Sequence, residues 1–215
     1  MSCINEDYIE KYIRGILPKS KGNLTKLEEY ASSNHIPIIQ KEVVQLLKVI
    51  LGISNPRNIL EIGTAIGYSA LVMASSTHDN CAITTIERRR DMIELAQKNI
   101  YDTRYRNRIN ILHGDAVEVL PKINKMFDFI FLDASKGHYL EFFIECMNLL
   151  ENGGLIVSDN VLFRGMVACD DLVVRRKKTI VKRLREYLNY INNLEGYETC
   201  IVPIGDGLAL TYKKE

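Results

Sequence analysis

The sequence predicts a doubly wound α/β fold with a mostly parallel, seven-stranded sheet. We also expect a C-terminal antiparallel hairpin and an N-terminal helical extension. From residue 57 onward, short apolar runs alternate with amphipathic segments, which is typical of strand–helix–strand units with right-handed crossovers. Residues 1–52 have helical periodicity instead, and Gly205-Asp206-Gly207 between the last two apolar segments indicates a hairpin.

Each element follows from the spacing of its apolar residues. In the extension, helices are expected at 4–17, 24–33 and 41–51, and Pro37 makes 34–40 an extended linker. Strands are expected at 57–62, 81–86, 108–112, 127–132, 154–158, 197–203 and 207–213. Between them we expect helices at 67–76, 89–101, 115–120 and 138–150, and a long helix at 171–193. We expect a single domain over residues 1–215, with the extension at 1–52 and the α/β core at 57–215.

Composition and charge exclude several classes of protein. The chain has 215 residues, of which 47% are hydrophobic and 26% charged, and its formal net charge is +1. These values predict an ordinary soluble domain with a full core, in which attraction to polyanions requires a local patch. Five scattered cysteines without a C-x-x-C pair, together with the lack of a signal-like segment, predict reduced thiols in a cytoplasmic protein. No apolar run is long enough to span a membrane, so no membrane partner is expected.

Residues 58–70 have the pattern of a buried strand, a glycine turn and a helix start. Gly63 and Gly67 flank the turn, and such a turn presents backbone N–H groups to a ligand at a helix N-terminus. The spacing is G-x-x-x-G, without the G-x-G-x-x-G of dinucleotide enzymes, which disfavours a dehydrogenase. A glycine turn that merely ends a strand is the alternative.

Polar residues follow the next two predicted strands. Glu87 ends the second strand, where a carboxylate accepts hydrogen bonds from ribose hydroxyls. It also begins Glu-Arg-Arg-Arg and could simply neutralise that basic turn. Asp115 follows the third strand, where it either caps the next helix or contacts a purine edge.

A predicted metal site lies after the fourth and fifth strands. Asp133, Asp159 and Asn160 converge from adjacent strand ends, and two carboxylates with an amide oxygen suit Mg²⁺. Zinc is disfavoured because neither His nor Cys accompanies them. Lys136 follows closely, and a nearby dication would lower its pKa and favour the neutral amine as a base. A solvated loop lysine is the alternative.

A basic segment indicates a polyanionic partner. Residues 174–186 hold seven basic residues and one acid, and Arg164 precedes them. Further charge comes from Arg88 to Arg90 and from Arg104, Arg106 and Arg108. Such clustering suits phosphate contacts, although a basic helix face can also be only a solvated surface.

Taken together, these motifs resemble the cation-dependent, catechol O-methyltransferase-like family of methyltransferases with a Rossmann-like fold. The resemblance rests on residues 60–70, Glu87, residues 133–139, Asp159-Asn160 and Gly205-Asp206-Gly207, and it extends from about residue 30 to the C-terminus. Length and the Asp-Ala-Ser-Lys motif are most similar to the bacterial branch that methylates 5-hydroxyuridine in tRNA. The chain differs from the animal catechol enzymes, which carry a tryptophan before the catalytic lysine, because it contains no Trp.

The resemblance implies S-adenosyl-L-methionine as methyl donor, Mg²⁺ as metal and Lys136 as catalytic residue. The metal ligands would be Asp133, Asp159 and Asn160. The donor would lie near Ile38, Glu61, Gly63, Tyr68, Ser69, Glu87, Asp115, Ala116 and Asp133. RNA contacts are expected from Arg164, Arg175, Arg176, Lys177, Lys178, Lys182 and Arg183.

Three functions are therefore weighed. The first is a Mg²⁺-dependent methyltransferase that converts 5-hydroxyuridine at the wobble position of a tRNA anticodon loop to 5-methoxyuridine. The second is a small-molecule catechol or phenylpropanoid O-methyltransferase with the same core. The third is a non-catalytic module that binds the donor, which the retained metal and lysine positions disfavour. A homodimer is expected, as is common in the family.

Overall fold

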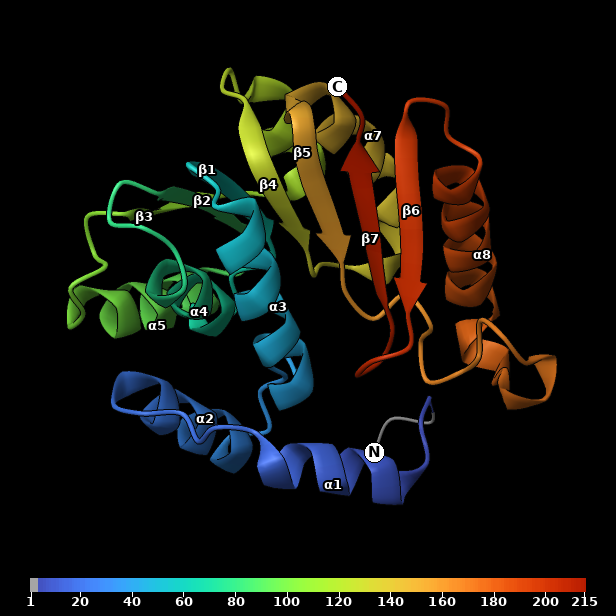
Figure 1. Cartoon of the computed structure of the whole chain (residues 1–215), viewed down its shortest axis with the longest axis horizontal. Helices are drawn as coiled ribbons and strands as arrows, with labels where there is room; N and C mark the ends of the chain where they lie inside the picture. Colours follow the sequence, from blue (N-terminus) through green and yellow to red (C-terminus); the bar gives the residue numbers. More distant parts are fainter. Residues whose placement is uncertain (1–3) are drawn as a thin grey trace. The chain divides into compact units, whose positions relative to one another are not determined.

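The computed structural model describes residues 4–215, in which strands and helices alternate as predicted (Figure 1). The strands are β1 (Asn58–Ile62), β2 (Ala82–Glu87), β3 (Ile109–His113), β4 (Phe127–Leu132), β5 (Leu150–Ser158), β6 (Tyr197–Val202) and β7 (Leu208–Lys213). The α-helices are α1 (Asp7–Ile16), α2 (Asn23–Ser33), α3 (Lys41–Ser54), α4 (Tyr68–Ser75), α5 (Arg90–Tyr101), α6 (Ala116–Val119), α7 (Tyr139–Leu149) and α8 (Lys178–Asn192). Short 3-10 turns are η1 (Leu120–Lys122), η2 (Lys136–His138), η3 (Asp170–Leu172) and η4 (Arg175–Lys177).

The seven strands form one mixed sheet in the order β3-β2-β1-β4-β5-β7-β6. The pairs β1–β2, β2–β3 and β4–β5 are parallel, whereas β7 pairs antiparallel with both β5 and β6. The predicted doubly wound sheet and its C-terminal antiparallel hairpin are therefore confirmed. Among residues 4–215, none of the helices combines the length and the apolar character that a membrane crossing requires.

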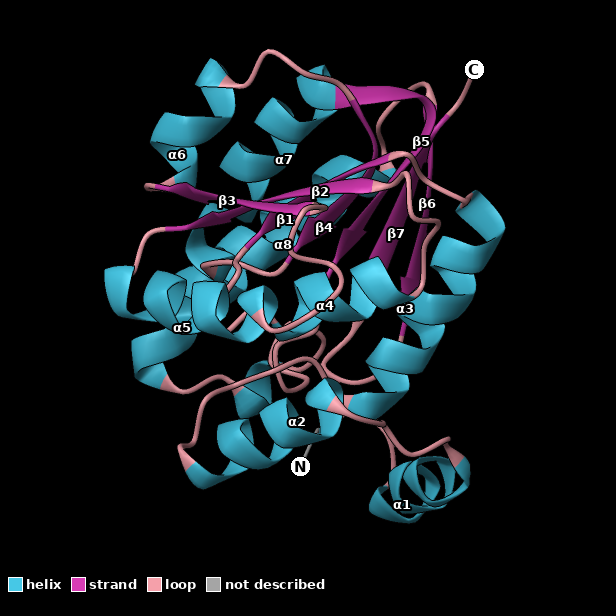
Figure 2. Ribbon diagram, turned by 90° about the vertical axis from the view of Figure 1, so that its left-hand side faces the viewer, coloured by secondary structure: helices cyan, strands magenta, loops and turns pink. Residues whose placement is uncertain are grey.

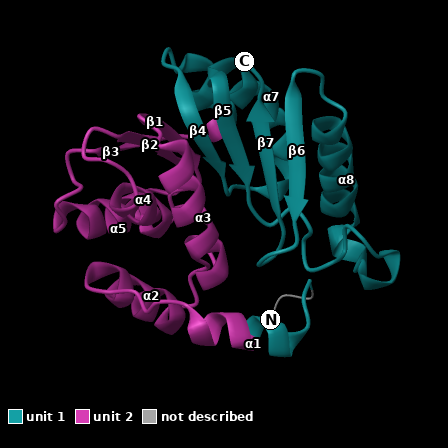
Figure 3. Ribbon diagram, in the orientation of Figure 1, with its two compact units in different colours: residues 1–10, 117–215 teal, residues 11–116 magenta. Residues whose placement is uncertain are grey.

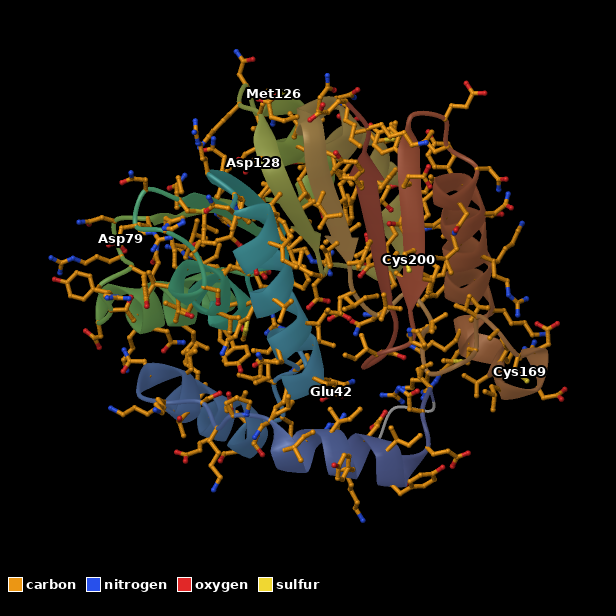
Figure 4. The ribbon with its side chains drawn as sticks, viewed as in Figure 1. Glu42, Asp79, Met126, Asp128, Cys169 and Cys200 are labelled. Carbon is orange, nitrogen blue, oxygen red and sulfur yellow. The ribbon has the colours of Figure 1, made fainter. Side chains whose placement is uncertain are left out.

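The chain divides into two compact units (Figure 3). Unit 2 comprises residues 11–116 and contains β1, β2 and β3. Ile59 and Leu60 of β1 are fully buried, while α4 and α5 pack against β2 (Figure 2). Within the extension, α1 is tied to α3 by a bidentate ion pair, in which Arg14 donates to both carboxylate oxygens of the buried Glu42 at 2.9 and 2.6 Å. Glu42 is labelled in Figure 4.

Unit 1 comprises residues 1–10 and 117–215, with β4 to β7 as its strands. The prediction for β4 is confirmed, and its Phe129, Ile130, Phe131 and Leu132 are fully buried. A strand buried on both faces reads as such a continuous apolar run. Helix α7 packs against β4 and β5, and α8 packs against β6 and α7.

Two predicted elements were wrong in extent. The expected helix at 171–193 begins only at Lys178, after the two turns η3 and η4. Val173 and Val174 have an extended backbone there, which separates the two turns and interrupts the expected helix. Strand β5 begins at Leu150 instead of residue 154. Leu150 pairs with Phe127 and Leu155 pairs with Phe129, so the extra residues of β5 between them, which include Asn152-Gly153-Gly154, form an irregularity in the strand pairing.

The cysteines that the structure describes carry free thiols. Cys81 and Cys146 are buried, while Cys169 and Cys200 are exposed (Figure 4). Cys3 lies outside the described residues.

Candidate functional site

The glycine turn between β1 and α4 is held in a conformation that favours glycine. Gly63 and Gly67 have φ of 109° and 81°, which side chains with a Cβ rarely adopt. The N–H groups of Gly63 and Thr64 both donate to the Ile86 carbonyl of β2, at 3.0 and 3.3 Å. A Cβ on Gly67 would also meet the Ile100 side chain at 3.2 Å. The predicted strand, turn and helix are thus present in unit 2.

Glu87 points its carboxylate at this turn. One oxygen accepts a hydrogen bond from the Ala65 N–H at 3.0 Å, and the other accepts from Arg88 and Arg89 N–H at 3.0 and 2.9 Å. The side chains of these arginines pair with other carboxylates, Arg88 with Asp115 and Arg89 with Asp91. Backbone groups therefore fix the position of the Glu87 carboxylate, and its oxygens keep lone pairs for further donors such as ribose hydroxyls.

Two predicted donor residues are engaged inside unit 2. Glu61 is fully buried and accepts a hydrogen bond from the Thr85 hydroxyl at 2.6 Å, while Thr85 also bonds Thr64 in the turn. Tyr68 donates its hydroxyl to Glu28 at 2.7 Å. Burial, followed by the Glu28 carboxylate, raises the pKa of Tyr68. These contacts give Glu61 and Tyr68 structural roles, and their direct contact with a donor stays a prediction.

The other predicted donor residues of unit 2 differ in exposure. Ser69 and Ala116 are buried, whereas Asp115 and Ile38, which lies in the extended linker, are half-buried. Asp115 directly precedes α6 and lies 3.8 Å from the Arg88 guanidinium.

The predicted metal ligands come together in unit 1. Asp133 follows β4, and Asp159 and Asn160 follow β5, whose residue Ser158 is in register with Leu132. The Asp159 N–H donates to the Leu132 carbonyl at 2.9 Å, and the Asp159 side chain is buried. Asn160 has φ of 57°, a left-handed conformation that asparagine tolerates better than most residues. Its backbone and side-chain N–H groups both donate to one Asp159 carboxylate oxygen, at 2.6 and 3.1 Å.

Negative charge exceeds positive charge around these residues. Burial raises the pKa of Asp159 well above its usual value, and the Asp133 and Asp206 carboxylates raise it further. The pKa of Asp133 is also raised, because the effect of burial exceeds the opposing effect of the Lys136 charge. Lys136 is the positive charge that acts on all three carboxylates, and Arg164 adds a second beside Asp206. A divalent cation would relieve the repulsion that remains.

The residue types present fit Mg²⁺ better than zinc. Within residues 4–215, no group of three or more His, Cys, Asp or Glu side chains is arranged to hold a metal. The set therefore depends on two carboxylates and the Asn160 amide oxygen, with further oxygens supplied by water or substrate, as Mg²⁺ commonly requires.

Lys136 lies in η2, directly beside these ligands. Its ammonium group donates to the Asn160 amide oxygen at 2.8 Å. The loop is held from α8, because Arg183 donates to the Gly137 carbonyl at 2.7 Å. The structure therefore brings Lys136 and the predicted metal set into one cluster.

Two residues of this cluster were not assigned a role from the sequence. The buried Tyr139 hydroxyl donates to the Asp159 carbonyl at 2.7 Å, and the Leu132 carbonyl lies at 3.5 Å. Asp206, in the turn before β7, accepts a hydrogen bond from the Arg164 N–H. Tyr139 stands in the motif after Lys136, but its inward direction depends on where α7 begins, which spacing alone does not give.

Three of the predicted RNA-binding residues use their side chains for contacts within unit 1. Arg183 holds the Gly137 loop, the Lys177 ammonium lies 5.6 Å from the centre of the Phe163 ring, and Lys182 pairs with Glu186 at 3.7 Å. The remaining residues are exposed in unit 1 and comprise Arg164, Arg175, Arg176 and Lys178.

Comparison with known proteins identifies the family. A family model described as O-methyltransferase matches residues 19–214. Caffeoyl-CoA O-methyltransferase of Eucalyptus gunnii is 28% identical over 97% of this chain and 88% of its own length, and caffeoyl-CoA O-methyltransferase 3 of Nicotiana tabacum is 29% identical over 97% and 91%.

Solved structures agree with this match. A Staphylococcus aureus protein provisionally described as a caffeoyl-CoA O-methyltransferase is 35% identical, with a TM-score of 0.90 over 96% of this chain and 100% of that one. A Bacillus cereus O-methyltransferase in complex with S-adenosylhomocysteine shares the fold, at 23% identity and a TM-score of 0.85 over 96% and 97%. The chain therefore belongs to the family of S-adenosylmethionine-dependent O-methyltransferases.

Proposed function

We propose that this O-methyltransferase transfers a methyl group to the 5-hydroxyl of 5-hydroxyuridine in a tRNA anticodon loop, in a Mg²⁺-dependent reaction. The observation that carries the RNA acceptor is the set of exposed cations in unit 1. Within residues 4–215, Arg175, Arg176 and Lys178 have no ion pair with a carboxylate. Cations left without acidic partners are available for phosphate groups.

The donor would be held by unit 2. The pinned carboxylate of Glu87 would accept hydrogen bonds from the ribose hydroxyls, and the Gly63 turn would allow close approach of the backbone. Asp115 would contact the purine edge. Its pairing with Arg88 is exposed, and an exposed pair costs little to rearrange.

The acceptor would be held by unit 1. Asp133, Asp159 and Asn160 would ligate Mg²⁺, and their surplus negative charge supports this assignment. When bound, the cation supplies positive charge that favours the ionised hydroxyl and fixes two neighbouring oxygens of the acceptor. The 5-hydroxyl and 4-carbonyl of 5-hydroxyuridine form such a pair, as do the two hydroxyls of a catechol.

Lys136 would take the acceptor proton. Its Nζ lies 2.8 Å from the Asn160 amide oxygen, so it already stands at the edge of the ligand set. This role requires the neutral form of the amine. Because the sulfonium donor is already activated, the remaining task of the chain is to orient the two reactants.

A small-molecule acceptor is the second candidate, and the family comparison favours it specifically. The relatives from Eucalyptus and Nicotiana are named for caffeoyl-CoA, whose catechol oxygens match the same chelating chemistry. The proposed ligand set would suit either molecule, so the exposed basic residues are the feature that favours the tRNA acceptor.

One experiment separates these candidates. Purified protein is incubated with donor and Mg²⁺, either with tRNA that carries 5-hydroxyuridine or with caffeoyl-CoA and simple catechols, and the products are measured by mass spectrometry. We expect 5-methoxyuridine from the tRNA, abolished by a chelator. Inert tRNA alongside rapid methylation of a catechol would contradict the proposal and favour the second candidate. Donor binding without any transfer would favour a non-catalytic module.

A further inference from the structure

Unit 2 contains a cavity of about 300 Å³ at the start of α2, beside α4 and the segment that follows α5. Its lining includes Lys21, Asn23, Leu24, Leu71, Asp102, Arg104 and Tyr105. None of these residues belongs to the predicted donor set. The volume lies at the lower end of the range for small-ligand pockets, which suits one nucleotide better than a large cofactor.

The cavity combines cations with an apolar surface. Lys21 and Arg104 are exposed, and within residues 4–215 neither forms an ion pair with a carboxylate. Asp102 also lines the cavity, so its cations outnumber its acids by two to one. Leu24 and the buried Leu71 supply apolar surface. A simple anion would leave the leucines unused, and an apolar ligand would leave the cations unused.

Basic and aromatic side chains alternate next to the cavity. The Arg104 guanidinium lies 5.0 Å from the centre of the Tyr105 ring, and that of Arg106 lies 5.7 Å from the centre of the Tyr101 ring. Tyr101 is 68% exposed. Proteins that bind single-stranded RNA combine such groups, because phosphates pair with cations and bases stack on aromatic rings and guanidinium planes.

Arg108 shows by contrast that charge alone does not define this surface. Its guanidinium donates to the Cys81 and Ala74 carbonyls at 2.9 and 3.0 Å and to the Thr77 hydroxyl at 2.7 Å. Arg108 therefore holds unit 2 together, whereas Arg104 and Arg106 face solvent.

We propose that this cavity binds one nucleotide of the RNA substrate, other than the nucleotide that is methylated. Its phosphate pairs with Lys21 and Arg104, and its base lies against Leu24 and Leu71. The proposal rests on the proposed tRNA function and adds a second RNA contact, in unit 2, to the basic residues of unit 1.

The test uses the double variant Lys21→Ala/Arg104→Ala of the full chain. The matched control is Lys26→Ala/Lys98→Ala, which removes the same charge from exposed positions on α2 and α5 outside the cavity lining. Binding to tRNA is measured by fluorescence anisotropy at several salt concentrations, and thermal unfolding checks that each variant folds. Methylation of hydroxylated tRNA by the wild type is measured in parallel.

We expect the Kd of the cavity variant to rise about tenfold, and the slope of log K against log salt concentration to fall by about 0.7, because one single-strand phosphate loses its cationic partners. The control should stay within about twofold of the wild type. Equal Kd values for the cavity variant and the control would overturn the cavity assignment, although wild-type methylation would still support the proposed function. A wild type that neither binds nor methylates tRNA would instead overturn the proposed function, and with it the RNA ligand of the cavity.

Discussion

Replacing Tyr139 by phenylalanine tests whether its hydroxyl positions Asp159, one of the proposed metal ligands. The Tyr139 hydroxyl donates to the Asp159 backbone carbonyl at 2.7 Å, and the side chain is 1% exposed. Because the Asp159 N–H also donates to the Leu132 carbonyl, these two hydrogen bonds hold Asp159 beside the end of β4. The variant removes the first of them and leaves the ring packing intact.

The expected magnitude follows from burial. Leaving a buried acceptor without its donor costs about 1–2 kcal/mol in the free energy of unfolding. For a chain of this size, that cost corresponds to a decrease in Tm of roughly 2–8 °C. Outer contacts that orient a metal ligand are worth about 10- to 100-fold in metal affinity. We therefore expect Mg²⁺ to bind at least about tenfold more weakly to Tyr139→Phe.

The matched control is Tyr187→Phe. Tyr187 is equally buried, packs edge-on against Tyr139 with ring centres 5.6 Å apart, and donates to or accepts from the Ser158 hydroxyl at 2.6 Å. Its hydroxyl bonds Ser158 and not the Asp159 carbonyl. Calorimetric titration with Mg²⁺ and thermal unfolding are measured on both variants. If Tyr139→Phe loses stability like the control but binds Mg²⁺ as tightly as the wild type, Tyr139 is merely structural and the reasoning is refuted.

Three further predictions follow. Lys136→Ala should lower kcat by about 100-fold or more while donor binding by calorimetry is retained, and full activity would exclude Lys136 as the base. Gly67→Ala should cost about 1–3 kcal/mol in denaturant unfolding, because φ is 81° and Ile100 crowds the new Cβ, whereas Gly52→Ala, inside α3 with open space around it, should stabilise by up to about 1 kcal/mol. Burial raises the pKa of Glu28, but hydrogen bonds from Ser20 and Tyr68 and the Lys41 charge lower it overall, below 4.5. Its stabilising contribution should thus be complete above pH 4.5 and be lost as the pH falls through the lowered folded-state pKa. Unfolding of the wild type and Glu28→Gln should therefore converge at acid pH, and a constant difference between them would contradict this assignment.

The strands were predictable because short local runs of apolar residues indicate which segments are buried. The apolar run at 127–132 needs no distant information to indicate β4, and Gly205-Asp206-Gly207 indicates the β6–β7 hairpin by turn chemistry alone. In contrast, the start of α8 depends on the extended backbone at Val173 and Val174, which the spacing of apolar residues in this segment does not indicate. The start of β5 depends on pairing between Leu150 and Phe127, a contact between residues far apart in sequence.

The candidate site was predictable where strand ends determine position, but not where tertiary contacts do. Parallel pairing of β4 and β5 was enough to bring Asp133 and Asp159 together. Nothing local indicates that Glu61 would be fully buried and bonded to Thr85, since both follow from the register of β1 with β2. Likewise, the approach of Asp206 to the cluster depends on the C-terminal hairpin.

That hairpin explains how the loop carrying Asn160 keeps its shape. Asn160, Phe163 and Arg164 all have positive φ, an arrangement that costs free energy at each residue. The loop is held by hydrogen bonds from Val161 to the Gly207 carbonyl at 2.9 Å and from Leu162 to the Asp206 carbonyl at 3.0 Å. A Cβ on Gly207 would collide with the Leu162 side chain, so glycine is required for this approach. Strain beside the proposed metal ligands is therefore supported by neighbouring residues that are distant in the sequence. This is expected where a ligand set must be in place before its cation binds, because a flexible loop would spend part of the binding free energy on its own ordering.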